Sequence, residues 1–139
     1  MSTPKTLSSE QMVDAVIQVL GRDDRVIFAY LYGTMLSEGQ GNDIDIAVFS
    51  DGQSDGHLLS ADLKIDLHKK TGHPPDTFDI RILNGIIEKG DLFALLYLKN
   101  VLEGVQVLVN KVPDVHAGFL ERYGLKFREC EGLIQEVLA

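Results

Sequence analysis

Three aspartates in this sequence have the side-chain chemistry and the spacing that a metal site needs. Asp43 and Asp45 stand two residues apart at the start of an apolar run. Because successive side chains of a strand alternate between its faces, both carboxylates are expected on one face, opposite Ile44, Ile46 and Val48. Like charges held so close repel each other, and a cation that carries substrate phosphates would relieve the repulsion. The pair therefore predicts a metal-nucleotide site.

The third aspartate, Asp79, lies in a later alternating segment, residues 77–83, in which Phe78, Ile80 and Ile82 share the opposite face. If this strand lies beside the one that carries Asp45, three carboxylates converge. Such a set can hold two cations that clamp the attacking and leaving oxygens of a phosphoryl transfer. An ion pair with Arg81 is the competing role for Asp79, but we expect those two side chains to point apart.

Gly33 and Thr34 directly follow an apolar segment at residues 26–32 and precede an eight-residue polar segment, 35–42. A glycine lets backbone N–H groups approach a phosphate closely, and the threonine adds a hydroxyl donor. If a short helix begins after them, its free N–H groups would point at the same anion. We therefore predict that Gly33 and Thr34 bind the phosphates of a nucleotide.

The elements that must position these residues follow from periodicity and capping signals. Helices are predicted from a cap at Ser8 to Gly21, from residue 58 to Gly72, over 86–98 and over 113–138, the last as one helix or two. Strands are predicted at 26–32, 43–49, 77–83 and 105–109. The fold class is α+β: a small mixed β-sheet with helices packed against it, which we place on one face. Residues 1–139 are expected to form a single domain, with the catalytic sheet reaching to about residue 84 and a helical C-terminal part.

Composition narrows the function classes. A net charge of −8 argues against a protein that holds nucleic acid by broad phosphate neutralisation, because that mode needs a basic face. No apolar run approaches the length of a membrane span, and the one cysteine, Cys130, permits no internal disulfide. We expect a cytoplasmic protein that binds no membrane. The histidines share no metal-ligand spacing and are expected at the surface or in loops: His57, His68, His73 and His116.

Taken together, Gly33-Thr34, Asp43-x-Asp45 and Asp79 resemble the minimal nucleotidyltransferase (MNT) family of the DNA polymerase beta-like superfamily, and most closely the MntA-type antitoxins of HEPN/MNT toxin-antitoxin pairs. The resemblance implies the nucleotidyltransferase fold. It implies that Gly33 and Thr34 bind the triphosphate of ATP, that Asp43, Asp45 and Asp79 bind Mg²⁺ and are catalytic, and that Asp79 helps to deprotonate the acceptor. It also implies a partner, a HEPN-type RNase toxin that receives AMP on a tyrosine, and it leaves a homodimer open.

Two alternatives to this enzyme stay open. The 35–42 segment is short and lacks the arginine that is common there in the family, and Asn42 replaces the usual serine before the first aspartate. A catalytically weak or inactive antitoxin that neutralises its toxin by binding alone is therefore the main rival. An enzyme that modifies a small molecule ranks lower, because so short a chain has little left to build an acceptor pocket.

Overall fold

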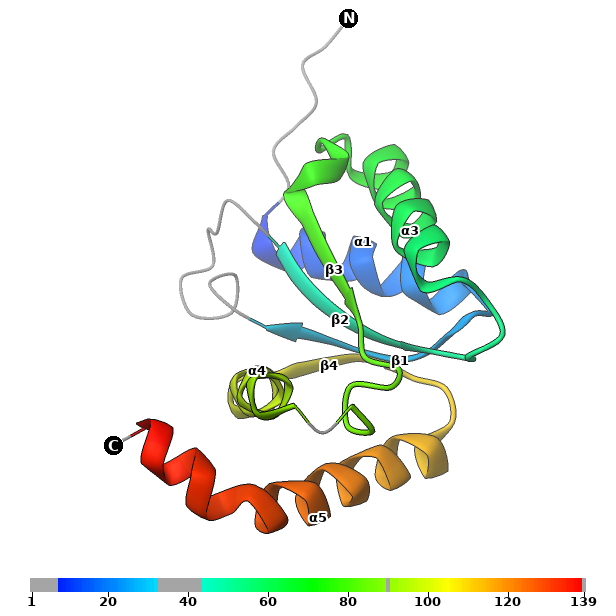
Figure 1. Ribbon diagram of the computed structural model, residues 1–139. Coiled ribbons are helices and arrows are strands. Elements are labelled where there is room, and N and C mark those ends of the chain that lie inside the picture. Colours follow the sequence, from blue (N-terminus) through cyan, green and yellow to red (C-terminus); the bar gives the residue numbers. More distant parts are fainter. Residues whose placement is uncertain (1–7, 33–43, 90, 139) are drawn as a thin grey trace, which may run out of the picture.

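The computed structural model describes residues 8–32, 44–89 and 91–138. Its elements, in chain order, are α1 (Ser9–Arg22), β1 (Val26–Tyr32), β2 (Ile44–Ser50), α3 (Gly56–Thr71), the 3₁₀ turn η1 (Pro75–Thr77), β3 (Phe78–Ile82), α4 (Leu92–Glu103), β4 (Gln106–Asn110) and α5 (Pro113–Leu138). All four predicted strands are present within about two residues of their predicted ends. The region 113–138 is one helix (Figure 1).

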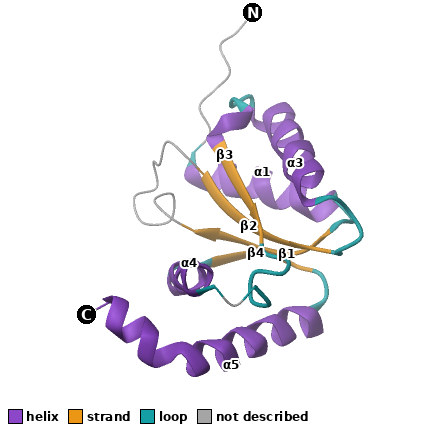
Figure 2. Ribbon diagram, in the orientation of Figure 1, coloured by secondary structure: helices purple, strands orange, loops and turns teal. Residues whose placement is uncertain are grey.

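The four strands form one mixed sheet in the order β3-β2-β1-β4. β1 is antiparallel to both β2 and β4, whereas β2 and β3 run parallel. A parallel pair needs a crossover connection, and α3 supplies it between β2 and β3 (Figure 2). This arrangement confirms the predicted α+β class with a mixed sheet.

Helices cover both faces of the sheet, so the prediction of helices on one face was wrong. α1 and α3 lie on one side, and α4 and α5 lie on the other (Figure 1). The α1/α3 face is mainly aliphatic, apart from Phe78 of β3, with Ile46, Val48 and Ile80 of the sheet packed among helix residues such as Leu20 and Leu63. The α4/α5 face is richer in aromatic side chains and includes Phe28, Tyr30 and Phe119. Strand β1 is buried on both sides, which explains why its sequence is continuously apolar rather than alternating.

The helix ends have clear local causes. The Ser8 side chain accepts from the Gln11 N–H and the Gln11 side chain accepts from the Ser8 N–H, which closes a capping box at the start of α1. Gly72 ends α3 with φ 79°, a left-handed conformation that glycine adopts without strain. No helix in the described part of the chain is both long and apolar enough to cross a membrane.

The helix predicted over 86–98 begins later than expected. Residues 84–89 form turns, Gly85 has φ 78°, and α4 starts at Leu92. Asp91 is its N-cap, and the Asp91 carboxylate accepts from the Phe93 N–H at 2.7 Å. Residues 86–89 are therefore not helical, contrary to the prediction, and the 84–89 turns follow directly after the end of β3.

Candidate functional site

Asp45 and Asp79 lie next to each other on neighbouring parallel strands. They are direct register partners in the β2–β3 pair, so their side chains share a face and lie side by side on adjacent strands. Asp45 is half-buried, and the Asp79 side chain is 46% exposed. Both lie on the α4/α5 face, because the intervening residues Ile44, Ile46 and Ile80 belong to the opposite, aliphatic cluster. The structure thus brings two of the three predicted carboxylates together, as the alternation of the strands predicts.

The other predicted site residues, Gly33, Thr34 and Asp43, lie outside the described residues. Their positions in the sequence adjoin the described part of the site. Gly33 and Thr34 directly follow β1, and Asp43 directly precedes β2. Tyr32, the last residue of β1, is the register partner of Asp45. The roles of Gly33, Thr34 and Asp43 therefore stay predictions.

Arg81 is a member of the site that sequence reasoning placed wrongly. Its guanidinium Nε lies 3.7 Å from Oδ2 of Asp79, so the expectation that the two side chains point apart was wrong. Residues two apart in a strand share a face, which brings Arg81 alongside the carboxylate. The same guanidinium lies over the ring of Tyr97 on α4, 5.5 Å from its centroid.

Two tyrosines border the carboxylate pair. The hydroxyls of Tyr32 and Tyr97 are hydrogen-bonded at 2.9 Å, which joins the end of β1 to α4. Burial raises the pKa of both phenols, and the negative charges of Asp45 and Asp79 raise the pKa of Tyr32 further. Asp79 also raises the pKa of Tyr97, while Arg81 lowers it. Both phenols are therefore neutral at physiological pH and serve as hydrogen-bonding groups rather than bases.

The donor chemistry of Asp45 and Asp79 fits a hard divalent cation. Two partly exposed carboxylates on one face offer oxygen ligands with an open side, which suits a Mg²⁺ ion that keeps waters and substrate oxygens as further ligands. Among the described residues no cluster of three or more His, Cys, Asp or Glu side chains could hold a metal ion. The third predicted carboxylate, Asp43, lies outside the described residues, so this result concerns Asp45 and Asp79 without it.

The opposite end of the β2–β3 pair is closed by Asn84, which sequence reasoning did not single out. Its side-chain oxygen accepts from the Ser50 N–H at 2.8 Å, and its side-chain nitrogen donates to the Ser50 carbonyl at 2.9 Å. Ser50 is buried, so these bonds satisfy backbone groups that would otherwise lose water without compensation. Asn84 fixes the turn after β3 to the end of β2, and a lone asparagine before a glycine gives no signal of such a long-range role.

His116 does not fit the expected class of surface or loop histidines. It lies in the first turns of α5, with Nε2 at 2.5 Å from the Tyr30 hydroxyl and Nδ1 at 3.2 Å from Nδ2 of Asn110. Burial lowers the pKa of its imidazole. The ring also packs against Phe28. His116 therefore joins α5 to the sheet.

The family of the chain is decided by a match to a family model. Residues 14–102, well over half of the chain, match the model described as polymerase beta, nucleotidyltransferase. The chain belongs to the polymerase beta nucleotidyltransferase family. The matched range of this nucleotidyltransferase spans Asp45, Asp79, Arg81 and Tyr97. A search of curated proteins finds no match.

Solved structures with the same fold include chains of toxin-antitoxin complexes. A chain from a toxin-antitoxin structure with AMP-PNP superposes with a TM-score of 0.58 at 18% identity, over 91% of this nucleotidyltransferase and 98% of that chain. A chain from the complex of the tri-AMPylated Shewanella oneidensis HEPN toxin with its MNT antitoxin gives 0.57 at 18% identity, over 94% and 99%. An MntA-HepT complex gives 0.55 at 17%, over 94% and 99%. At these identities the likeness shows the fold, and it agrees with the resemblance seen in the sequence.

Proposed function

We propose that this nucleotidyltransferase transfers AMP from ATP, with Mg²⁺, onto a tyrosine of a cognate HEPN-type RNase toxin and thereby acts as its antitoxin. The observation that carries the proposal is the in-register placement of Asp45 and Asp79 on one face of the β2–β3 pair. The family model supports nucleotidyl transfer, and the complexes of HEPN toxins with MNT antitoxins among the structural neighbours support the partner.

In this reaction each residue has a defined task. Asp45 and Asp79, together with Asp43, would hold the cations, whose charge offsets that of the reacting phosphates and of the leaving oxygen. Gly33 and Thr34 would bind the triphosphate. The acceptor oxygen bonds to the α-phosphorus, the bond from that phosphorus to pyrophosphate breaks, and the hydroxyl proton passes to the Asp79 carboxylate. No covalent intermediate with the protein is needed, because phosphoryl transfer depends mainly on positioning and electrostatics.

A partner protein is also favoured by the surface of α5. Leu125 and Leu133 of α5 are 52% and 58% exposed, and a bound partner protein would cover these apolar side chains. These residues would also serve the rival function, an antitoxin that neutralises its toxin by binding alone. The two functions therefore differ in the need for the carboxylates.

The deciding experiment combines the protein, Mg²⁺, labelled ATP and the HEPN-type protein encoded beside its gene. We expect the partner to gain adenylate, detected by intact mass, and its RNA cleavage to stop. Asp45→Asn should abolish both effects, whereas Asp66→Asn, an exposed change on α3, should preserve both. Full neutralisation by Asp45→Asn without any adenylate would establish the binding-only antitoxin instead.

A further inference from the structure

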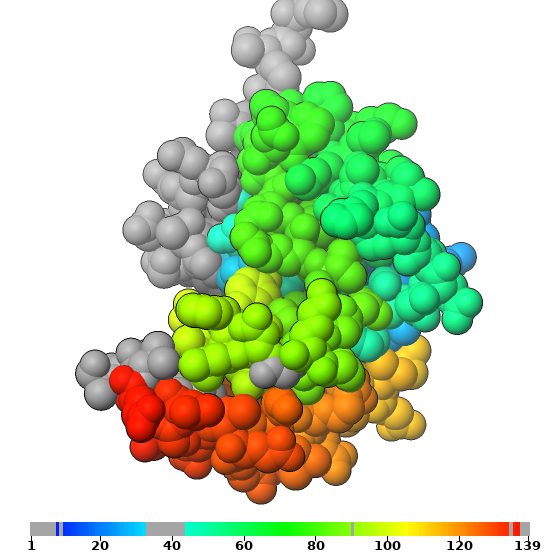
Figure 3. All heavy atoms as spheres, in the orientation of Figure 1, coloured from blue at the N-terminus to red at the C-terminus, as the bar shows by residue number. Residues whose placement is uncertain are grey.

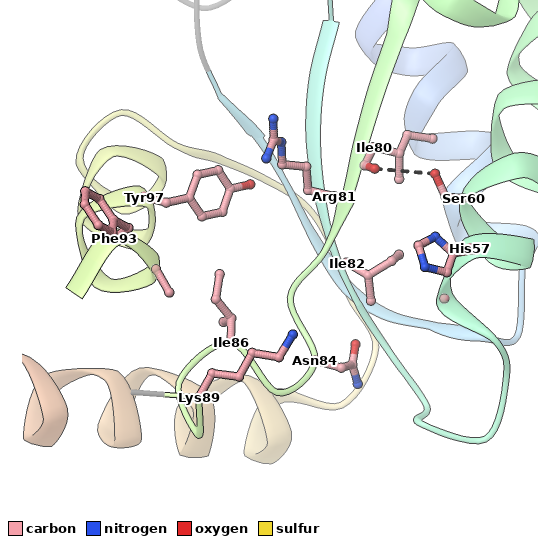
Figure 4. Close-up of a pocket in the computed structure, with 12 residues that line it drawn as sticks. His57, Ser60, Ile80, Arg81, Ile82, Asn84, Ile86, Lys89, Phe93 and Tyr97 are labelled. Carbon is pink, nitrogen blue, oxygen red and sulfur yellow. Dashed lines mark hydrogen bonds between the residues drawn. The ribbon is translucent and has the colours of Figure 1, made fainter. Parts of the chain in front are cut away.

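A cleft of about 650 Å³ lies along the outer edge of β3, the edge strand of the sheet. Its walls come from the start of α3, from the 84–89 turns and from α4. Figure 3 shows α4 and these turns between α5 and the β3/α3 region. Figure 4 shows His57 and Ser60 on the α3 side, and Phe93 and Tyr97 on the α4 side.

The cleft adjoins the carboxylate pair formed by Asp45 and Asp79. Arg81 and Tyr97 line the cleft, and the same two residues border the site, since Arg81 lies 3.7 Å from Asp79 and Tyr97 is bonded to Tyr32. A ligand in the cleft would therefore lie beside Asp79 rather than at a separate place on the surface.

The side chains that line the cleft are more basic than the protein as a whole. Its lining among the described residues includes two cationic side chains, Arg81 and Lys89, and no aspartate or glutamate, although the chain has 21 acidic and 13 basic side chains. Arg81 is paired with Asp79, which lies outside the lining. Glu88, the neighbour of Lys89, is paired with Arg122 on α5 at 3.4 Å and does not neutralise the lysine. The Lys89 side chain extends into the cleft toward Asn84 (Figure 4). A cationic cleft in an acidic protein selects for a ligand with negative charge.

The position of the cleft matches the acceptor side of the proposed reaction. The attacking and leaving oxygens of a phosphoryl transfer lie roughly in line across the phosphorus. Gly33 and Thr34 follow β1, so the pyrophosphate would leave on the β1 side of Asp45. The acceptor must then approach from the other side, where β3 and the cleft lie.

We propose that this cleft receives the acceptor, and that the acceptor is a protein segment with carboxylates close to its reactive hydroxyl. This assignment rests on the proposed function for the direction of attack. Lys89 would bind a carboxylate of the segment, and the Arg81 side chain, which contacts Asp79 through Nε and is 59% exposed, would bind a second one through its terminal nitrogens. The ring of Phe93, which is 78% exposed on the rim of the cleft, would pack against its apolar side chains.

The test measures binding without any reaction. The ¹⁵N-labelled protein is titrated with the peptide Glu-Glu-Tyr-Glu-Glu, with Lys-Lys-Tyr-Lys-Lys, and with ADP and Mg²⁺. The acidic peptide should shift the amide signals of residues 80–89 and 93–97, the basic peptide should not, and ADP should leave residues 84–89 unchanged. Because no AMP is transferred, failure of the proposed function would leave this result intact, and the reverse also holds.

A matched pair of charge reversals then tests the cationic lining. Lys89→Glu should weaken binding of the acidic peptide about five-fold, as expected for reversing one partly exposed charge, while Lys70→Glu on α3 should change it less than two-fold. Equal binding of the two peptides, shifts outside the cleft, no binding, or ADP in the cleft would each overturn the assignment. So would equal effects of the two lysine variants.

Discussion

The α1/α3 face of the sheet and its α4/α5 face are built from the same four strands but carry different side chains. On the α1/α3 face the strands present mainly aliphatic residues, together with Phe78, to Leu59, Leu63 and Leu67 of α3, which are all fully buried. On the α4/α5 face, aromatic residues are interspersed with polar pairs: Tyr32 with Tyr97, Tyr30 with His116, and Asp79 with Arg81. One face supplies stability through apolar burial, and the other holds every described residue that we place in the site.

The comparison teaches where the sequence tolerates an unfavourable arrangement. Two carboxylates in direct register on parallel strands destabilise a sheet, because like charges directly opposite each other repel. Among the described residues, the α1/α3 cluster contains no such pair of like charges. At the other end of the same two strands, the backbone N–H and carbonyl of Ser50 are both hydrogen-bonded to the Asn84 side chain. The contact between Asp79 and Arg81 offsets part of this repulsion, and the cation of the proposed reaction would offset more of it.

The largest expected effect follows from removing a charge from the polar face. Asp79→Asn keeps the shape of the side chain but weakens its binding to a cation, so AMP transfer should fall at least about 1,000-fold. The free energy of unfolding without Mg²⁺ should stay within about 0.5 kcal/mol, because the change relieves repulsion with Asp45 but weakens the contact with Arg81. Initial rates with labelled ATP and urea denaturation measure the two quantities. A loss of several kcal/mol in the free energy of unfolding would show that Asp79 has a structural role.

A core substitution on the aliphatic face should have the converse effect. Leu63→Ala should lower the free energy of unfolding by about 3 kcal/mol, because this fully buried side chain would leave a cavity. Leu58→Ala on the same helix removes a side chain that is 57% exposed and serves as the control, with a loss below about 1 kcal/mol. The rate of AMP transfer per folded molecule should stay within two-fold for both. A lower rate of AMP transfer per folded molecule in Leu63→Ala would contradict the assignment of stability to one face and of catalysis to the other.

A smaller effect is expected at the hydroxyl pair beside the site. Tyr97→Phe removes the bond to Tyr32 and should cost about 1 kcal/mol of unfolding free energy. Tyr32→Phe should cost about the same, and the double variant should cost clearly less than the sum, since both single changes break one bond. Urea denaturation of the four proteins completes the cycle. Additive losses would mean that the two hydroxyls do not interact.

Much of the fold could be predicted because the relevant signals are local. The cap at Ser8, the αL glycine at Gly72 and the alternation of 78–82 fix elements without reference to the rest of the chain. The shared face of Asp45 and Asp79 followed from the same alternation once the strands were taken as neighbours. The family resemblance then gave the predicted roles of the site residues.

What could not be predicted depends on distant contacts. The helical layer formed by α4 and α5 could not be predicted from β1, because a strand that is buried on both faces shows no alternation of apolar and polar residues. The start of α4 was missed because apolar residues at 86–87 extended the helical pattern across the turn at Gly85. Asn84 and His116 act on residues 34 and 86 positions away, Ser50 and Tyr30, and nothing in their neighbours reveals those partners.

The smallest expected effect concerns the pH dependence of the bond that attaches α5 to the polar face. Burial lowers the pKa of His116 in the folded protein below its ordinary value of 6.5. Above pH 6.5 the imidazole is neutral in both states, so its contribution to stability is fully present. As the pH falls from 6.5 through the folded pKa, the unfolded chain takes up the proton first and the free energy of unfolding decreases. His116→Gln lacks this titration, so the wild-type protein should lose more stability than the variant between pH 7 and pH 5 in urea denaturation. Parallel curves for the two proteins would mean that His116 is equally solvated in both states, and α5 would then be held by Phe119 and its apolar neighbours alone.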